Sequence, residues 1–123
     1  MVHNSLVIVE AHPLTRTALS MAITAAGMNV LAEISSNKDV MPLVPGLHPD
    51  LVLFSVGTPG LDDLKTISSL HKALPETFIA ALLSGEINGQ EKAALGHGAK
   101  MVIQKTATRE EILSMLEQLR NLL

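Results

Sequence analysis

The chain has 123 residues with a formal net charge of −3, and 47% of them are hydrophobic, enough apolar material for a buried core. This length predicts one domain over residues 1–123. No stretch approaches the roughly 18 apolar residues that span a bilayer, and the N-terminus lacks the basic start of a signal peptide. The absence of cysteine excludes disulfides, a thiol nucleophile and a zinc ribbon. We therefore expect a cytoplasmic protein without a membrane contact.

The basic residues are few and scattered along the chain, which argues against direct nucleic-acid binding. Backbone binding requires a cluster of lysine and arginine, and no such cluster is present. The chain also has no tryptophan or tyrosine and only 2 phenylalanines, so it lacks the aromatic platforms that stack on single strands.

Short apolar runs alternate with amphipathic stretches from one end of the chain to the other. The expected strands are residues 6–9, 29–34, 51–56, 78–83 and 100–104. The expected helices run from Pro13 to a C-cap at Gly27, from about Asn37 after a cap at Ser36, from a cap at Asp62 or Asp63 to near Ala73, from about Gly89 to residues 96–98, and from a Thr108 capping box onward. Pro42 and Pro45 make the second helix the least regular element.

Five rounds of strand followed by helix predict an α/β fold with a parallel sheet and helices on both faces. We expect a flavodoxin-like, doubly wound sheet of five strands in the order 2-1-3-4-5, with five helices. In that order the site lies at the carboxyl ends of the first and third strands. The rule nominates a pocket of Glu10, Ala11, Ser55, Ser84 and Lys105, each of which follows or ends a predicted strand.

Several of these strand ends match one family in order and spacing. Residues 7–13 combine an apolar run with an acidic residue and His-Pro, and residues 49–55 combine Pro-Asp with a second apolar run. Residues 58–61 are similar to a Met-Pro-Gly-Met loop, and residues 98–100 and Lys105 match the final third. Over essentially its whole length the chain resembles a bacterial response-regulator receiver domain of the LuxR/NarL, CheY-like type.

The resemblance implies a two-component signalling module, but this sequence departs from the family at three positions. A receiver accepts a phosphoryl group on a central aspartate, beside a magnesium ion held by acidic residues. Ser55 stands at that phospho-acceptor position, and a serine hydroxyl is a weak nucleophile without a base. Ala11 replaces the second acidic residue, and Val102 stands at the switch position, where receivers often carry an aromatic side chain. We therefore expect no phosphorylation of Ser55, no metal site and no cofactor.

Glu10, Ser84 and Lys105 keep family-like chemistry, and from them we expect the Lys105 ammonium to contact Glu10, Ser55 or both. Other interpretations stay open. Ser55 with His12 as its base would make a nucleophile, Glu10 and His12 would offer two metal ligands, and Ser55 would accept phosphate in an ordinary receiver. A small flavodoxin-like ligand-binding domain or enzyme using Glu10, Ser55 and Lys105 is the main alternative, although the chain lacks G-x-G-x-x-G, P-loop and G-x-S-x-G motifs.

The last helix carries a second apolar set, Leu113, Met115 and Leu122, beside its core-facing residues. This set is either a wide core contact or the surface for a protein partner or a homodimer. The predicted function is accordingly a phosphorylation-independent, degenerate receiver without enzymatic activity. It would act in transcription regulation through protein contacts, controlling a C-terminal DNA-binding domain outside this chain.

Overall fold

The computed structural model describes residues 4–57, 60–85, 89–105 and 108–122, except for the side chains of residues 109, 119, 120 and 122. Five parallel strands form one sheet in the order β2-β1-β3-β4-β5, as predicted. The strands are β1 (Ser5–Val9), β2 (Asn29–Ile34), β3 (Leu51–Ser55), β4 (Phe78–Leu83) and β5 (Met101–Gln104). The helices are α1 (Pro13–Ala25), α2 (Val40–Leu47), α3 (Leu61–Ala73), α4 (Gln90–His97) and α5 (Arg109–Leu122), with a 3-10 turn η1 (Asn37–Asp39) before α2.

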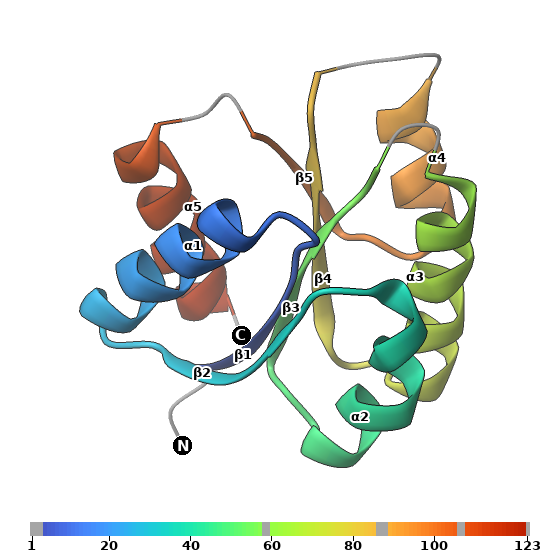
Figure 1. Ribbon diagram of the computed structural model, residues 1–123, viewed down its shortest axis with the longest axis horizontal. Helices are drawn as coiled ribbons and strands as arrows, with labels where there is room; N and C mark the ends of the chain where they lie inside the picture. The colour runs from blue at the N-terminus through green and yellow to red at the C-terminus, as the bar shows by residue number, and fades with distance from the viewer. Residues whose placement is uncertain (1–3, 58–59, 86–88, 106–107, 123) are drawn as a thin grey trace.

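The sheet lies between two layers of helices. Figure 1 shows α1 and α5 on one face and α2, α3 and α4 on the other. Side chains of a strand alternate between faces, so a strand buried on both sides is apolar at every position. In β3, Leu51 and Leu53 pack on the α1/α5 face, whereas Val52 and Phe54 pack on the opposite face. The continuous apolar run in β3 is therefore what a central strand of this sheet requires.

Each face of the sheet has its own core. The core under α2, α3 and α4 is the larger and includes Val7, Phe54, Ile67, Leu70 and Ile79. The core under α1 and α5 includes Leu6, Ile8, Ile23, Ile103 and Leu116. None of the helices in the described ranges is long and apolar enough to cross a membrane.

The prediction that Asp62 or Asp63 caps α3 is wrong. The N-cap is Gly60, which has a left-handed backbone (φ 72°) and no side chain to accept a hydrogen bond. Its carbonyl still accepts the first helical bond, from the Leu64 amide at 3.0 Å. Both aspartates lie in the first turn instead, where a carboxylate interacts favourably with the helix dipole.

The second helix also departs from the expectation. Ser36 does cap a turn, accepting a hydrogen bond from the Lys38 amide at 3.3 Å, but the turn from Asn37 is the 3-10 turn η1. The α-helix begins only at Val40 and contains Pro45, which cannot donate a backbone hydrogen bond. At the other end of the chain the Thr108 cap is confirmed, because its hydroxyl oxygen accepts from the Glu111 amide at 3.1 Å.

Candidate functional site

Three polar side chains meet at the carboxyl end of the sheet. Glu10 follows β1, Ser55 is the last residue of β3, and Lys105 follows β5. Ser55 Oγ donates to Glu10 Oε1 at 3.0 Å, and Lys105 Nζ lies 3.0 Å from the same oxygen. The expected contact of Lys105 is therefore with Glu10, although β3 and β4 lie between their two strands in the sheet. One carboxylate oxygen receives both the hydroxyl and the ammonium.

Glu10 is a buried carboxylate, only 3% exposed, and its surroundings favour the charged form. Burial by itself raises the pKa of a carboxyl group. Here the hydrogen bonds from the His12 amide, Lys105 and Ser55, with the charge of Lys105, outweigh that effect and hold the pKa of Glu10 below its usual value. The His12 amide donates to Glu10 Oε2 at 3.1 Å, so both carboxylate oxygens are bound. A carboxylate held ionised in this way is a weak proton acceptor and a good counter-charge.

These groups line a cavity of about 220 Å³ that also includes residues the sequence did not predict. Asp63, in the first turn of α3, accepts from the Asn37 side-chain amide at 2.7 Å and from the Gly57 amide at 2.8 Å. Ser35 also lines the cavity. The sequence could have predicted Ser35 and Asn37, because they follow the second strand. That strand lies beside the first strand, whose carboxyl end is at the topological switch point. Asp63 carried no such signal, since it comes from a helix.

The other predicted pocket positions are distributed differently. Ala11 lines the cavity and is exposed, contributing no side-chain polar group. Ser84 follows β4 but is exposed and lies outside the residues that line the cavity. Val102, at the switch position, lies in β5 and packs against the core under α2, α3 and α4. Lys105 and Ser55 are the predicted residues that the structure brings together with Glu10.

His12 has a structural role in this arrangement. It is the N-cap of α1, and its Nδ1 accepts from the Thr15 amide at a long 3.4 Å. The hydroxyl of Ser55 donates to Glu10 instead of to this ring. The geometry therefore gives no support to His12 as a base for Ser55.

The residues of the cavity do not fit a magnesium ion of the kind that receivers hold. Such an ion needs several oxygen ligands, and the side chain of Ala11 has none to offer. Both oxygens of Glu10 are bound by donors within the protein, and so are both oxygens of Asp63. In the described parts of the chain no three histidine, aspartate or glutamate side chains are grouped as metal ligands.

The apolar residues of α5 face the core in part. Leu113 and Met115 are half-buried and pack against the core under α1 and α5, which is the wide core contact considered above. The side chain of Leu122 lies outside the described part of the chain. An apolar groove of about 390 Å³ runs between α1 and α5, with Leu19, Ile112 and Leu113 among its lining residues. Leu14, also in the lining, is 77% exposed.

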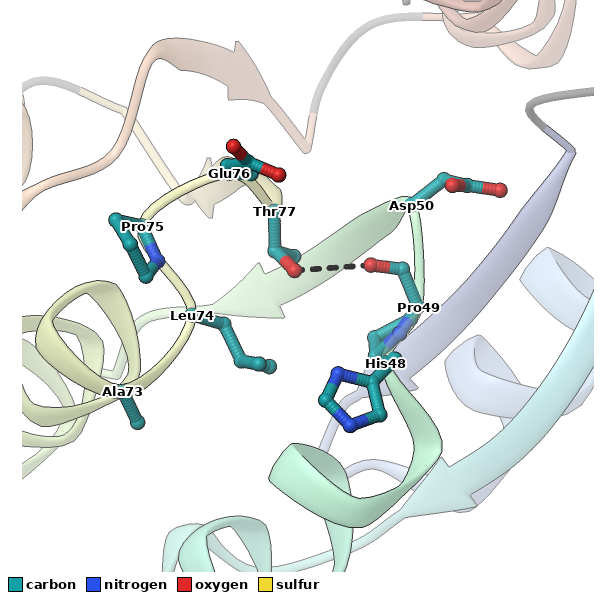
Figure 2. Close-up of a pocket in the computed structure, with 8 residues that line it drawn as sticks. All are labelled: His48, Pro49, Asp50, Ala73, Leu74, Pro75, Glu76 and Thr77. Atoms are coloured by element: carbon teal, nitrogen blue, oxygen red, sulfur yellow. Dashed lines mark hydrogen bonds between the residues drawn. The ribbon is translucent and has the colours of Figure 1, made fainter.

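A larger cavity, of about 570 Å³, lies at the opposite end of the sheet. Figure 2 shows its eight lining residues, which come from the turn before β3 and from the end of α3 with the turn before β4. The Thr77 hydroxyl donates to the Pro49 carbonyl at 2.9 Å, tying the two turns together. The polar groups here hold turns in place, whereas those at the carboxyl end converge on one carboxylate.

The order of the strands is that of a receiver domain, and comparison with known proteins agrees. Residues 6–117 match the family model for the response regulator receiver domain, so the chain belongs to that family. It is a family of signalling proteins that work in two-component systems.

Two curated relatives are longer regulators. The chain is 29% identical over 118 residues to the nitrate/nitrite response regulator NarL of Escherichia coli K12, covering 93% of this chain and 53% of the relative. It is 23% identical over 115 residues to the DNA-binding transcriptional activator EvgA of the same strain, covering 94% of this chain and 56% of the relative. The chain thus spans about half the length of the curated relatives it matches.

Solved structures share the fold. The signal receiver domain of a NarL response regulator from Mycobacterium tuberculosis superposes with a TM-score of 0.85 at 24% identity, covering 98% of both chains. A CheY-like receiver from Methanospirillum hungatei superposes with a TM-score of 0.86 at 14% identity, covering 96% of this chain and 94% of that one. The predicted LuxR/NarL-type, CheY-like fold is therefore confirmed.

Proposed function

We propose that this chain is one degenerate receiver domain over residues 1–123 that signals without aspartyl phosphorylation and catalyses no reaction. The observation that carries the proposal is the Ser55–Glu10–Lys105 cluster. Lys105 has its counter-charge within the protein, at 3.0 Å, and the hydroxyl at the acceptor position donates to that same carboxylate. A serine also cannot form the labile acyl phosphate that makes a receiver reversible. The centre of the pocket is thus charge-balanced without a phosphoryl group.

The test is incubation of the purified chain with acetyl phosphate and magnesium, followed by intact-mass spectrometry. We expect no phosphoryl adduct on the wild-type chain and none on the Ser55→Ala control. An acid-stable adduct that disappears in Ser55→Ala would overturn the proposal, and so would a hydroxylamine-sensitive adduct on any carboxylate. An unrelated receiver with its aspartate intact serves as the positive control for the reagent.

We further propose a homodimer through the apolar face of α1 and α5. Leu14 and Met21 of α1 are 77% and 69% exposed, next to the groove whose lining includes Ile112 and Leu113. A two-fold dimer needs a self-complementary patch, and this face combines projecting apolar side chains with an apolar hollow. Few polar groups line the groove, so a second copy of the chain can cover it without burying unpaired hydrogen-bonding groups.

Sedimentation of the wild-type chain and two variants tests the dimer. Leu14→Glu places a charge on the proposed face and should shift the chain to a monomer. Leu43→Glu, at a position 51% exposed on α2, is the matched control and should leave the dimer intact. A wild-type chain that stays monomeric at high micromolar concentration would rule out this contact, as would equal behaviour of the two variants.

The names of the relatives suggest which kind of domain this receiver controls. EvgA is named a DNA-binding transcriptional activator, and this chain matches about half of its length. We propose that the domain works in the cytoplasm and controls an attached DNA-binding domain through protein contacts, without binding DNA itself. The product of the whole gene tests this, because a helix-turn-helix segment downstream is expected and a kinase segment there would contradict it.

A further inference from the structure

The backbone of Gly57 is bound on both sides by helix side chains. Gly57 lies two residues after Ser55, and its amide donates to Asp63 Oδ2 at 2.8 Å. Its carbonyl accepts from Gln90 Nε2 at 2.7 Å. The amide of Gly57 is therefore held by α3 and its carbonyl oxygen by α4. Gly57 also lines the cavity with Glu10 and Ser55.

Gln90 is an unusual residue for the start of a helix. It is the first residue of α4, yet it is 7% exposed, whereas glutamine is mostly found on the surface. The N-cap of α4 is Gly89, which offers no side-chain cap. The helix has 8 residues and depends on tertiary contacts, because short helices are marginal alone. The hydrogen bond from Gln90 to Gly57 is thus a main anchor for the start of α4.

Two further residues fit this anchor. Asn37 donates to Asp63 Oδ1 at 2.7 Å and so holds the carboxylate that binds the Gly57 amide. Gly60 leaves the space that the anchor needs. A methyl group at position 60 would overlap the Gly57 carbonyl oxygen and would lie 3.1 Å from Gln90 Nε2. A series of three hydrogen bonds therefore links η1 to Asp63, Asp63 to Gly57, and Gly57 to α4.

We propose that Asp63, Gly57 and Gln90 form a latch that couples the pocket to the position of α4. Asp63 and Gly57 are parts of the pocket wall, and Gln90 carries their position to the start of the helix. A change that draws Asp63 away from Gly57 frees the Gly57 amide, so the carbonyl that Gln90 binds is held less firmly and the start of α4 loosens. The latch consists of neutral and charged hydrogen bonds already present, so it does not depend on whether Ser55 is phosphorylated.

Hydrogen exchange of the Ala93 and Ala94 amides, in the first turn of α4, measures how firmly the latch holds. Gln90→Leu removes the donor and keeps an apolar volume in a buried place. We expect it to speed exchange at these amides about five- to thirtyfold, which corresponds to a loss of about 1–2 kcal/mol in the free energy of local opening. Lys92→Gln, at an exposed position of the same helix, is the matched control and should change nothing. The Leu53 amide, in the centre of β3, reports global unfolding and should stay slow in every variant.

A double-mutant cycle tests the coupling itself. Asp63→Ala, at the pocket wall, should also speed exchange at Ala93 and Ala94, and should add nothing further in the Gln90→Leu background. The proposal fails if Asp63→Ala leaves α4 unchanged, if the two effects add in full, or if Gln90→Leu behaves like Lys92→Gln. Asn37→Ala, which removes the support of Asp63, replaces Asp63→Ala under the same criteria if the latter does not fold.

Discussion

The two ends of the sheet carry cavities of different character. The cavity at the amino end is larger, about 570 Å³ against 220 Å³, and its hydrogen bonds, such as the one from the Thr77 hydroxyl to the Pro49 carbonyl, hold turns in place (Figure 2). In the smaller cavity, at the carboxyl end, the Ser55 hydroxyl and the Lys105 ammonium both contact one oxygen of the buried Glu10 carboxylate. The larger cavity is thus not the one where charged groups converge, and the convergence lies at the end where the strand order predicts the site.

The largest effect is expected from tight backbone packing at the carboxyl end. Gly60→Ala adds a methyl group against the Gly57 carbonyl and strains a residue with φ 72°. We expect a loss of about 3 kcal/mol or more in the free energy of unfolding, measured in urea. Gly27→Ala, at the amino end, is the control. Its φ is 90° but nothing lies within 4 Å, so only the backbone strain of about 1–2 kcal/mol should appear. Equal losses would show that the two ends are packed alike.

Removing the ammonium at the carboxyl end should have the next largest effect. Lys105→Met leaves the buried Glu10 carboxylate without its opposite charge. We expect a loss of about 2 kcal/mol at neutral pH, less than for a fully buried pair because Lys105 is 29% exposed. Lys92→Met, at an exposed position on α4, should stay within about 0.5 kcal/mol. A Lys105→Met variant as stable as the wild type would mean that the charge pair does not hold the pocket together.

At the amino end, Thr77→Val keeps the shape of the side chain and removes the hydroxyl that Pro49 accepts from. Thr77 is 6% exposed, so the carbonyl loses a buried partner and we expect a loss of about 1 kcal/mol. The amide chemical shifts around Ser55 should not move. Shifted amide resonances around Ser55 would show that the two ends of the sheet are coupled, contrary to this prediction.

The smallest effect concerns pH and the charge of Glu10. Since its pKa is lower in the folded chain than the ordinary value of 4.5, the unfolded state takes up the proton first as the pH falls. The stabilisation is therefore complete above about pH 4.5 and is lost as the pH falls through the folded pKa. Glu10→Gln should flatten the stability–pH curve in this acid range. An unchanged slope would show that Glu10 is not held ionised by its partners.

Much of the fold followed from apolar patterns in the sequence. The second and fourth strands have the predicted bounds. The fourth is a buried, uninterrupted apolar run between turns, whereas the second alternates between exposed and partly buried positions. Helix starts were harder to predict. The start of α3 rests on Gly60, whose left-handed backbone leaves no side-chain signal, so the nearby aspartates were mistaken for caps.

The site was predicted as far as strand ends determine it. Glu10, Ser55 and Lys105 follow from the strand order, since the carboxyl ends of parallel strands share one edge. Asn37 and Asp63 come from a 3-10 turn and a helix start, and their meeting depends on how those elements are rotated. Spacing along the chain does not specify that rotation, which is set by packing on the sheet.

The pairing of Glu10 with Lys105 also limits how an aspartate acceptor could be built into this site. A single substitution, Ser55→Asp, would place two carboxylates beside one ammonium and leave one negative charge without a partner. Like charges at that distance raise the pKa of one carboxyl group, so the new aspartate would be partly protonated and a poor nucleophile. Restoring the acceptor therefore requires a second change, one that supplies ligands for a cation, such as an acidic residue in place of Ala11. On the proposed function, the present site therefore lies at least two substitutions away from one that accepts a phosphoryl group.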